Sequence, residues 1–143
     1  MTIRKAEPKD KKDILEITNL LYLDIPNFVW NTDEFIDRQI KNGEYFLAET
    51  EEKIVGIISF RQRKKKIHIE TLSATDDHQS EGVGSQLIGF AKEFTKEKGF
   101  SILRVYSFHE YKTIDFYLKQ GFSLLEKPGI YNNHEYYRLE MRI

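Results

Sequence analysis

The stretch Gln79-Ser80-Glu81-Gly82-Val83-Gly84-Ser85 places two glycines, one residue apart, just before an amphipathic segment. The first residues of a helix present unpaired N–H groups and the positive end of the helix dipole. Glycines at such a point allow an anion, most often a phosphate, to come within hydrogen-bonding distance of the backbone. A turn that enters a helix with a positive φ also favours glycine, so the motif indicates a phosphate site without establishing it.

Residues 67–74, Ile-His-Ile-Glu-Thr-Leu-Ser-Ala, form a second feature that can do chemistry, because they alternate as a β-strand does. The alternation predicts two sets of side chains that face opposite ways: His68, Glu70 and Leu72 on one side, and Ile67, Ile69 and Thr71 on the other. Two ionisable side chains on one face of a strand indicate a cleft, where either could remove a proton from a substrate. A solvated sheet face would hold the same pair without any chemistry.

Length, composition and net charge limit the classes of protein to which this sequence can belong. The 143 residues, 40% hydrophobic and 31% charged, predict one globular domain over residues 1–143. Charges of 22 basic against 23 acidic residues leave no basic field for nucleic acid. The absence of cysteine excludes a disulfide framework and a cysteine nucleophile, and the spacing of His78, His109 and His134 does not suggest a metal site. The polar start and the short apolar runs predict a cytoplasmic protein that does not enter a membrane.

The remaining patterns predict the elements that hold the two features. Strands are expected at residues 2–6, 44–50, 53–62, 67–74, 102–108, 122–126 and 134–142. Helices are expected from Asp10, across 31–40, from Val83 to Gly99, and across 111–120, with Asp10 and Asn31 as caps. Turns join the early strands and helices join the later ones. This order predicts an α+β domain with a mixed, mostly antiparallel sheet of about six to seven strands and four helices.

A third motif, Phe116-Tyr117-Leu118-Lys119-Gln120-Gly121-Phe122, falls at the end of the last predicted helix. Together with residues 79–84, it resembles the GNAT family, the acetyl-CoA-dependent N-acetyltransferases. That family has a [Q/R]-x-x-G-x-[G/A] loop between a strand and a helix, and a pattern close to F-Y-x-x-x-G-F on its fourth helix and the strand after it. The predicted order of elements also matches, so the resemblance covers essentially the whole chain.

The resemblance implies an N-acetyltransferase that moves the acetyl group of acetyl-CoA to a primary amine by direct attack. It implies that the loop, namely Gln79, Ser80, Glu81, Gly82, Val83, Gly84 and Ser85, holds the coenzyme A pyrophosphate. The strand backbone at Leu72, Ser73 and Ala74 would then bind the thioester and the pantetheine arm, with the Leu72 N–H on the acetyl carbonyl. No metal is implied.

The resemblance also assigns the chemistry to named side chains. It places Tyr117 near the coenzyme sulfur, where a phenol with a pKa near ~10 suits a thiol leaving group near ~8.5. The family often has a glutamate base on the strand of residues 67–74, so Glu70 or His68 would accept the amine proton directly or through water. An ordinary buried aromatic at Tyr117 is the structural alternative.

Two positions depart from the family's pattern. Glu81 stands where many members have a basic residue, and Glu110 stands where the family often has an asparagine. An acid beside a pyrophosphate is repulsive unless it points to solvent. A non-catalytic domain that binds acyl-CoA therefore remains an alternative.

The resemblance implies that the acceptor binds between the first two helices, the last two strands and the cleft at the strand of residues 67–74. Aromatic residues gather in those segments, and they could wall an apolar or cation–π pocket or pack as core: Tyr22, Phe28, Trp30, Tyr131 and Tyr136. The acceptor would be a small molecule or an amine of a peptide or protein, and the protein a monomer or homodimer.

A basic run, Arg61-Gln62-Arg63-Lys64-Lys65-Lys66, suggests a further alternative. A hairpin tip with this charge could bind RNA or another acidic partner. Solvated lysines also gather at hairpin tips, where they protect sheet edges. Near-zero net charge favours the second interpretation.

Overall fold

The computed structural model describes residues 1–51, 53–75, 82–125 and 127–143. The elements are β1 (Thr2–Lys5), α1 (Lys11–Thr18), α2 (Asp33–Lys41), β2 (Tyr45–Thr50), β3 (Lys53–Arg63), β4 (Lys66–Ala74), α3 (Val83–Glu97), β5 (Ile102–Phe108), α4 (Ile114–Lys119), β6 (Ser123–Leu124), β7 (Gly129–Tyr131) and β8 (His134–Arg142). Short 3₁₀ turns cover Pro8–Asp10, Asn19–Leu21 and His109–Tyr111. The predicted α+β class is confirmed.

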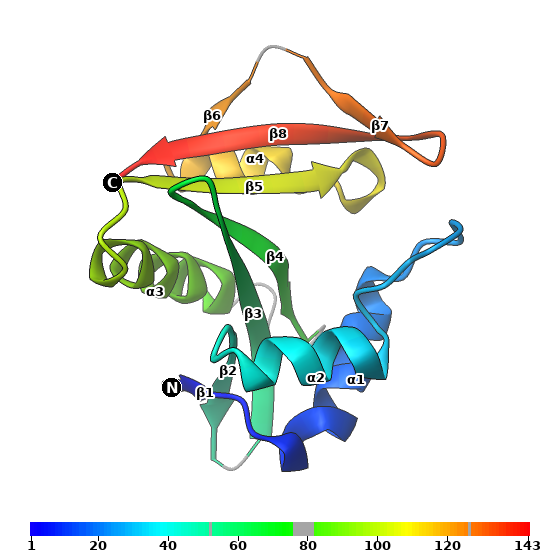
Figure 1. Cartoon of the computed structure of the whole chain (residues 1–143), viewed down its shortest axis with the longest axis vertical. Coiled ribbons are helices and arrows are strands. Elements are labelled where there is room, and N and C mark those ends of the chain that lie inside the picture. Colours follow the sequence, from blue (N-terminus) through cyan, green and yellow to red (C-terminus); the bar gives the residue numbers. More distant parts are fainter. Residues whose placement is uncertain (52, 76–81, 126) are drawn as a thin grey trace.

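The described strands form one sheet in the order β1-β2-β3-β4-β5-β8-β6, with β7 paired to β8 (Figure 1). Among the described strands, only β4 and β5 pair in parallel, and the other pairs are antiparallel. The sheet has eight strands rather than six or seven, because residues 129–131 form a hairpin with β8 that the sequence pattern did not reveal.

Helices pack on both faces of the sheet (Figure 1). The larger core holds α3 with residues of α4, β5 and β8, and the smaller core holds α1 and α2 against β2 and β3. Strand β3 supplies Ile58 to the first core and Ile57 to the second, and both side chains are fully buried. Burial on two faces explains why β3 is apolar at successive positions.

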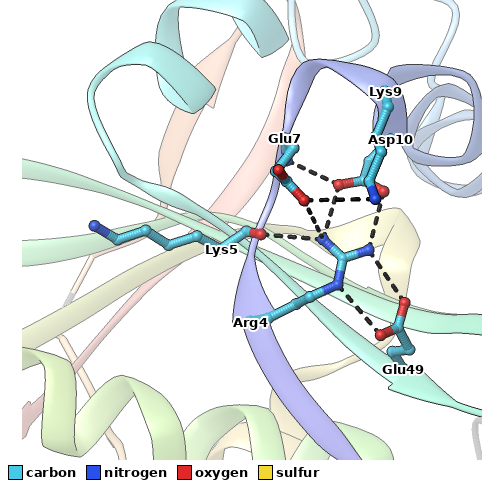
Figure 2. A network of polar contacts seen from close by, with 6 residues as sticks. All are labelled: Arg4, Lys5, Glu7, Lys9, Asp10 and Glu49. Carbon is cyan, nitrogen blue, oxygen red and sulfur yellow. Dashed lines mark hydrogen bonds and ion pairs between the residues drawn. The ribbon is translucent and has the colours of Figure 1, made fainter.

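Arg4 fixes the start of the chain to the first helix (Figure 2). Its guanidinium donates two hydrogen bonds to Asp10, at 2.9 and 3.0 Å, and two to Glu49 on β2, at 3.2 and 3.1 Å. The Glu7 N–H also donates to Asp10 at 2.8 Å. The predicted cap role of Asp10 is therefore wrong: its carboxylate makes no side-chain cap on α1 and joins β1 to the turn before that helix.

Two other helix boundaries differ from the prediction. Thr32 rather than Asn31 caps α2, because its hydroxyl accepts from the Phe35 N–H at 3.3 Å. The last helix begins at Ile114 instead of residue 111, since His109–Tyr111 form a 3₁₀ turn that Lys112 ends in a left-handed conformation, φ 54°. The end at Gly121, with φ 104°, agrees with the prediction.

Candidate active site

A cavity of about 500 Å³ opens where β4 and β5 separate. The parallel pairing extends only from Ile67 opposite Leu103 to Ile69 opposite Val105, although β4 continues to Ala74 and β5 to Phe108. The divergence is visible in Figure 1. Residues from both strands, from the segment between α1 and α2, and from α4 line the cavity. Among them are the expected residues Glu70, Leu72, Ser73, Ala74, Gly84 and Tyr117.

A β-bulge at Glu70 shapes the β4 wall. Ser59 of β3 lies opposite Thr71, but the next residue, Phe60, lies opposite Ile69, so Glu70 is the extra residue. The predicted alternation is therefore wrong beyond this point. Thr71 shares a buried hydroxyl contact with Ser59 at 2.7 Å, whereas Leu72 packs against the same core as Ile69.

Glu70 is held by two donors from other segments. The Trp30 Nε1–H donates to Glu70 Oε2 at 3.0 Å, and Arg61 Nε lies 2.9 Å from Oε1. The Glu70 side chain is only 12% exposed. A carboxylate has about four acceptor sites, so the fixed group retains capacity for a proton, an amine or a water.

His68 lies beside Glu70, and both line a second cavity of about 210 Å³ next to the first. The imidazole is buried and meets the Tyr106 ring edge-on at 5.6 Å. Burial lowers the pKa of His68 to about 4, with a further contribution from the positive charges of Arg61 and Arg104. At neutral pH this side chain is a neutral imidazole.

Tyr117 belongs to the larger core and also lines the first cavity. No hydrogen bond joins its hydroxyl to a residue that the structure describes, whereas the nearby Tyr111 hydroxyl donates to the Leu21 carbonyl at 2.5 Å. Burial raises the pKa of the Tyr117 phenol well above its usual range. The phenol therefore keeps its proton at neutral pH and is available as a donor.

The glycine motif is described from Gly82 onward, while Gln79, Ser80 and Glu81 lie outside the described residues. Gly82 precedes α3 with φ 78°, a conformation that favours glycine. Gly84 lines the first cavity, but a Cβ there would lie 3.0 Å from the Phe116 ring, so the helix–helix contact also requires a small residue.

Two other loop residues have structural contacts. Val83 is buried in the larger core, and the Ser85 hydroxyl accepts from Gln120 Nε2 at 2.9 Å. Their side chains join α3 to its neighbours. Any contact that they offer an anion would come from their backbone.

Four of the five aromatic residues predicted for the acceptor gather at the cavities. Trp30 lines both, Phe28 lines the first, and Tyr131 and Tyr136 line the second. Phe28 and Tyr131 meet the Trp30 ring edge-on at 5.0 and 6.2 Å. Tyr22 lines neither cavity: it is 52% exposed and touches the edge of Phe28 at 5.4 Å.

Sequence reasoning missed several wall residues. Tyr106 and Phe108 line both cavities, and Tyr111 and Thr113 line the first. The signal was present in strand 102–108, where residues 104, 106 and 108 alternate with the apolar core positions. Glu110, which was noted as a departure, lines the first cavity, and its carboxylate contacts His134 Nδ1.

The basic run is divided between strands rather than gathered in one loop. Arg61, Gln62 and Arg63 belong to β3, Lys66 begins β4, and only Lys64 and Lys65 form the turn. Both turn residues have positive φ, 51° and 61°. Because Arg61 pairs with Glu70, one end of the run belongs to the candidate active site.

A match to a protein-family model identifies the family of the chain. The model of the acetyltransferase (GNAT) family matches residues 13–122, which is more than half of the sequence. The chain therefore belongs to the acetyltransferase (GNAT) family.

Individual relatives are more distant. N-acetyltransferase family 8 member 3 of Rattus norvegicus is 28% identical over 85 residues, which are 54% of this chain and 37% of that protein. The matched region thus spans little more than a third of the relative's length.

Solved structures share the fold over nearly the whole chain. Ard1 from Thermoplasma volcanium superimposes with a TM-score of 0.84 at 19% identity, covering 99% of this chain and 97% of that one. A ribosomal-protein-alanine N-acetyltransferase from Brucella melitensis gives 0.80 at 18% identity, covering 100% of both chains. The PaiA N-acetyltransferase from Thermoplasma acidophilum, solved with coenzyme A, gives 0.74 at 18% identity, covering 99% and 98%.

The described residues contain neither a candidate membrane-spanning helix nor a candidate metal-binding cluster. No helix there combines the length and the apolar character that a membrane crossing demands. No group of three or more His, Cys, Asp or Glu side chains in the same part of the chain could hold a metal ion.

Proposed function

We propose that this protein transfers the acetyl group of acetyl-CoA to a primary amine by direct attack. The observation that carries the proposal is one shared cavity: the Tyr117 phenol and the Glu70 carboxylate both line the space between β4 and β5. A proton donor and a proton acceptor in one cleft are what acetyl transfer to an amine needs.

Acetyl-CoA would lie along the separated end of β4. The parallel ladder stops at Ile69, so an extended pantetheine arm has room beside Leu72, Ser73 and Ala74 in the manner of an added strand. The pyrophosphate would meet the α3 N-terminus, with Gly82 and Gly84 next to it and Gln79, Ser80 and Glu81 in the same loop. Backbone N–H groups would supply most of that contact, because Val83 and Ser85 use their side chains elsewhere.

The proposed transfer begins with attack of the amine and ends with departure of the coenzyme A sulfur. The amine nitrogen attacks the acetyl carbonyl carbon, and the Leu72 N–H would stabilise the resulting oxyanion. Collapse breaks the C–S bond, and the Tyr117 hydroxyl gives its proton to the departing sulfur. The Tyr117 hydroxyl supports this role because it lines the cavity and has no hydrogen bond to the described protein, and its raised pKa keeps the phenol protonated at neutral pH.

Glu70 is the better candidate for the base. His68 is the alternative by position, but it lines only the second cavity and not the cavity that Tyr117 lines. Glu70 faces both cavities and is oriented by Trp30 and Arg61. We therefore assign proton removal, directly or through one water, to Glu70. His68 would form part of the cavity wall as a neutral imidazole.

The acceptor would enter through the second cavity. Trp30 and Tyr131 form part of its wall, and Phe28 supports Trp30 from the first cavity. Tyr22 would bind an acceptor only outside these cavities, at the rim beside Phe28. The acceptor end of the site thus combines aromatic faces with one carboxylate, which suits a cationic or neutral amine.

Two measurements test the proposal. Calorimetry with acetyl-CoA and with free coenzyme A checks binding, and release of free thiol in the presence of a panel of amines and peptides checks transfer. Binding followed by acceptor-dependent thiol release is the expected result. Binding without turnover on any acceptor would favour the non-catalytic acyl-CoA-binding alternative, and absence of binding would overturn both.

A further inference from the structure

Three arginines lie on the face of the sheet that carries His68, and one of them, Arg61, lines the second cavity. Arg61 of β3 pairs opposite His68 of β4, His68 lies beside Arg104 of β5, and Tyr106 of β5 pairs opposite Arg138 of β8. Residues opposite each other on adjacent strands project to the same face. Three guanidinium groups thus share one face with the cavity wall.

Arg138 adjoins that wall through an aromatic pair. The rings of Tyr106 and Tyr136 both line the second cavity, and their centroids lie 5.5 Å apart. The Arg138 guanidinium lies 5.5 Å from the centre of the Tyr136 ring, over its face. This stacking leaves the edge of the planar guanidinium, with its N–H groups, available to a ligand.

The charges on this face do not cancel. Arg61 pairs with Glu70 at 2.9 Å, and Arg104 donates to Glu140 at 3.0 Å. Arg138 has no carboxylate partner among the residues that the structure describes, and its guanidinium donates to the Tyr136 hydroxyl at 3.5 Å. An arginine beside an aromatic cavity without an acidic partner is suited to bind a carboxylate from outside.

The lowered pKa of His68 agrees with a positive electrostatic potential at this cavity wall. After burial, the causes that lower its pKa are the charges of Arg61, Arg104, Arg63 and Lys66. Four cations therefore act on one side chain in the wall, in a protein whose formal net charge is only −1.

We propose that the acceptor is a primary amine that also carries a carboxylate, and that Arg138 binds this carboxylate while the amine meets Glu70. The inference rests on the proposed acetyl transfer and names the chemical class of its acceptor. The two ends of such a molecule match two groups at the second cavity: the Glu70 carboxylate in its wall suits the amine, and the Arg138 guanidinium stacked on Tyr136 suits the carboxylate. Either a free amino acid or an acidic residue near the amine of a peptide provides this chemistry.

The test compares acceptors that differ only in the anionic group. Lysine with cadaverine, and tyrosine with tyramine, are matched pairs of free amines with and without a carboxylate. A peptide that begins Met-Asp-Glu and its amide counterpart that begins Met-Asn-Gln form the peptide arm. We would measure kcat/KM for each compound with wild-type protein, Arg138→Gln and Arg142→Gln.

Arg142→Gln is the matched control. It makes the same change of charge on the same strand, at an exposed position. Neither arginine lines a cavity itself, but Arg138 stacks on Tyr136, which lines the second cavity. Neither arginine has a part in the proposed transfer chemistry. Acetyl-CoA affinity should therefore remain at the wild-type value in both variants.

In at least one arm, we expect the wild type to prefer the carboxylate-bearing member by about tenfold or more. Arg138→Gln should remove most of that preference and leave kcat/KM for the neutral member unchanged, while Arg142→Gln should retain the preference. The arm that shows the effect identifies the source of the carboxylate.

Equal turnover of both members in both arms, or a preference that survives Arg138→Gln, would overturn the inference and leave acetyl transfer standing. Acetyl-CoA binding without turnover of any acceptor would instead overturn the proposed function, and this inference with it.

Discussion

The indole Nε1–H of Trp30 donates a hydrogen bond to Glu70 Oε2 at 3.0 Å, which joins the segment before α2 to the bulge of β4. Trp30 also packs edge-on against Phe28 and Phe108. The aromatic cluster therefore fixes the direction in which the Glu70 carboxylate points. Acceptor binding and orientation of the proposed base depend on the same side chain.

The first prediction concerns this hydrogen bond. Trp30→Phe removes the N–H donor but keeps an aromatic ring, so Glu70 should lose its fixed orientation while the fold survives. We expect kcat/KM for the acceptor to fall about tenfold, the typical effect of losing a hydrogen bond to a charged group. Acetyl-CoA affinity, measured by calorimetry, should not change. A folded variant with the wild-type kcat/KM would show that this contact does not serve transfer.

Trp30 also provides a direct reporter, because it is the single tryptophan of the sequence. We expect its fluorescence emission to change when an acceptor is added to the coenzyme-bound protein, since the indole lines both cavities. The titration should give the same dissociation constant as calorimetry. An accepted amine that leaves the emission unchanged would place the acceptor outside these cavities.

The third prediction separates the proposed acid from its neighbour. Tyr117→Phe removes a hydroxyl without a hydrogen bond to the described protein, so stability and acetyl-CoA affinity should persist while kcat falls about 10²–10⁴-fold. Tyr111→Phe is the matched control: it breaks the bond to the Leu21 carbonyl and should cost about 0.5–1.5 kcal/mol of unfolding free energy. Similar kcat values for the two variants would assign the proton to water or another residue.

The sequence predicted the fold class and much of the site because those signals are local. Two glycines before an apolar stripe, and a tyrosine in a short helix motif, can be recognised within a few residues. Glu70, Gly84 and Tyr117 line one cavity, and Gly82 precedes α3, while their roles in the site stay predictions.

The features that escaped prediction depend on distant pairing. The bulge at Glu70 arises from the register between β3 and β4, and nothing in residues 67–74 alone marks it. The contacts of Glu70 with Arg61 and Trp30 join three separate segments. Strand β7 has only three residues, too few for alternation to show, and it exists because β8 supplies its partner.

The fourth prediction tests why residue 84 is glycine. A Cβ at Gly84 would lie 3.0 Å from the Phe116 ring, whereas a Cβ at Gly89 of the same helix meets nothing within 4 Å. Gly84→Ala should lower the free energy of unfolding by about 1–3 kcal/mol through overpacking. Gly89→Ala should raise it by about 0.5–1 kcal/mol, because alanine favours helix. Urea denaturation of both variants provides the comparison.

A double variant then separates packing from coenzyme binding. Phe116→Leu in the Gly84→Ala background should relieve the contact and recover stability, while acetyl-CoA affinity should remain about tenfold weaker if the coenzyme also needs the space. Recovery of both quantities would mean that residue 84 is small for the sake of Phe116 alone.

The fifth prediction follows from His68, whose pKa is lowered to about 4 by burial and by nearby cations. The unfolded chain, with an ordinary histidine pKa near ~6.5, binds more protons than the folded protein between these two values. His68 therefore makes the folded state less stable as the pH falls through this window, by on the order of 1–3 kcal/mol at pH 4.

His68→Phe keeps a ring against Tyr106 and removes the titration, so its unfolding free energy should fall less between pH 7 and pH 4. The measurement is urea denaturation at several pH values, with His109→Phe, the same change at an exposed position, as the control that should keep the wild-type pH dependence. An equally steep loss of stability in His68→Phe would show that the imidazole becomes charged without opposition in the folded protein.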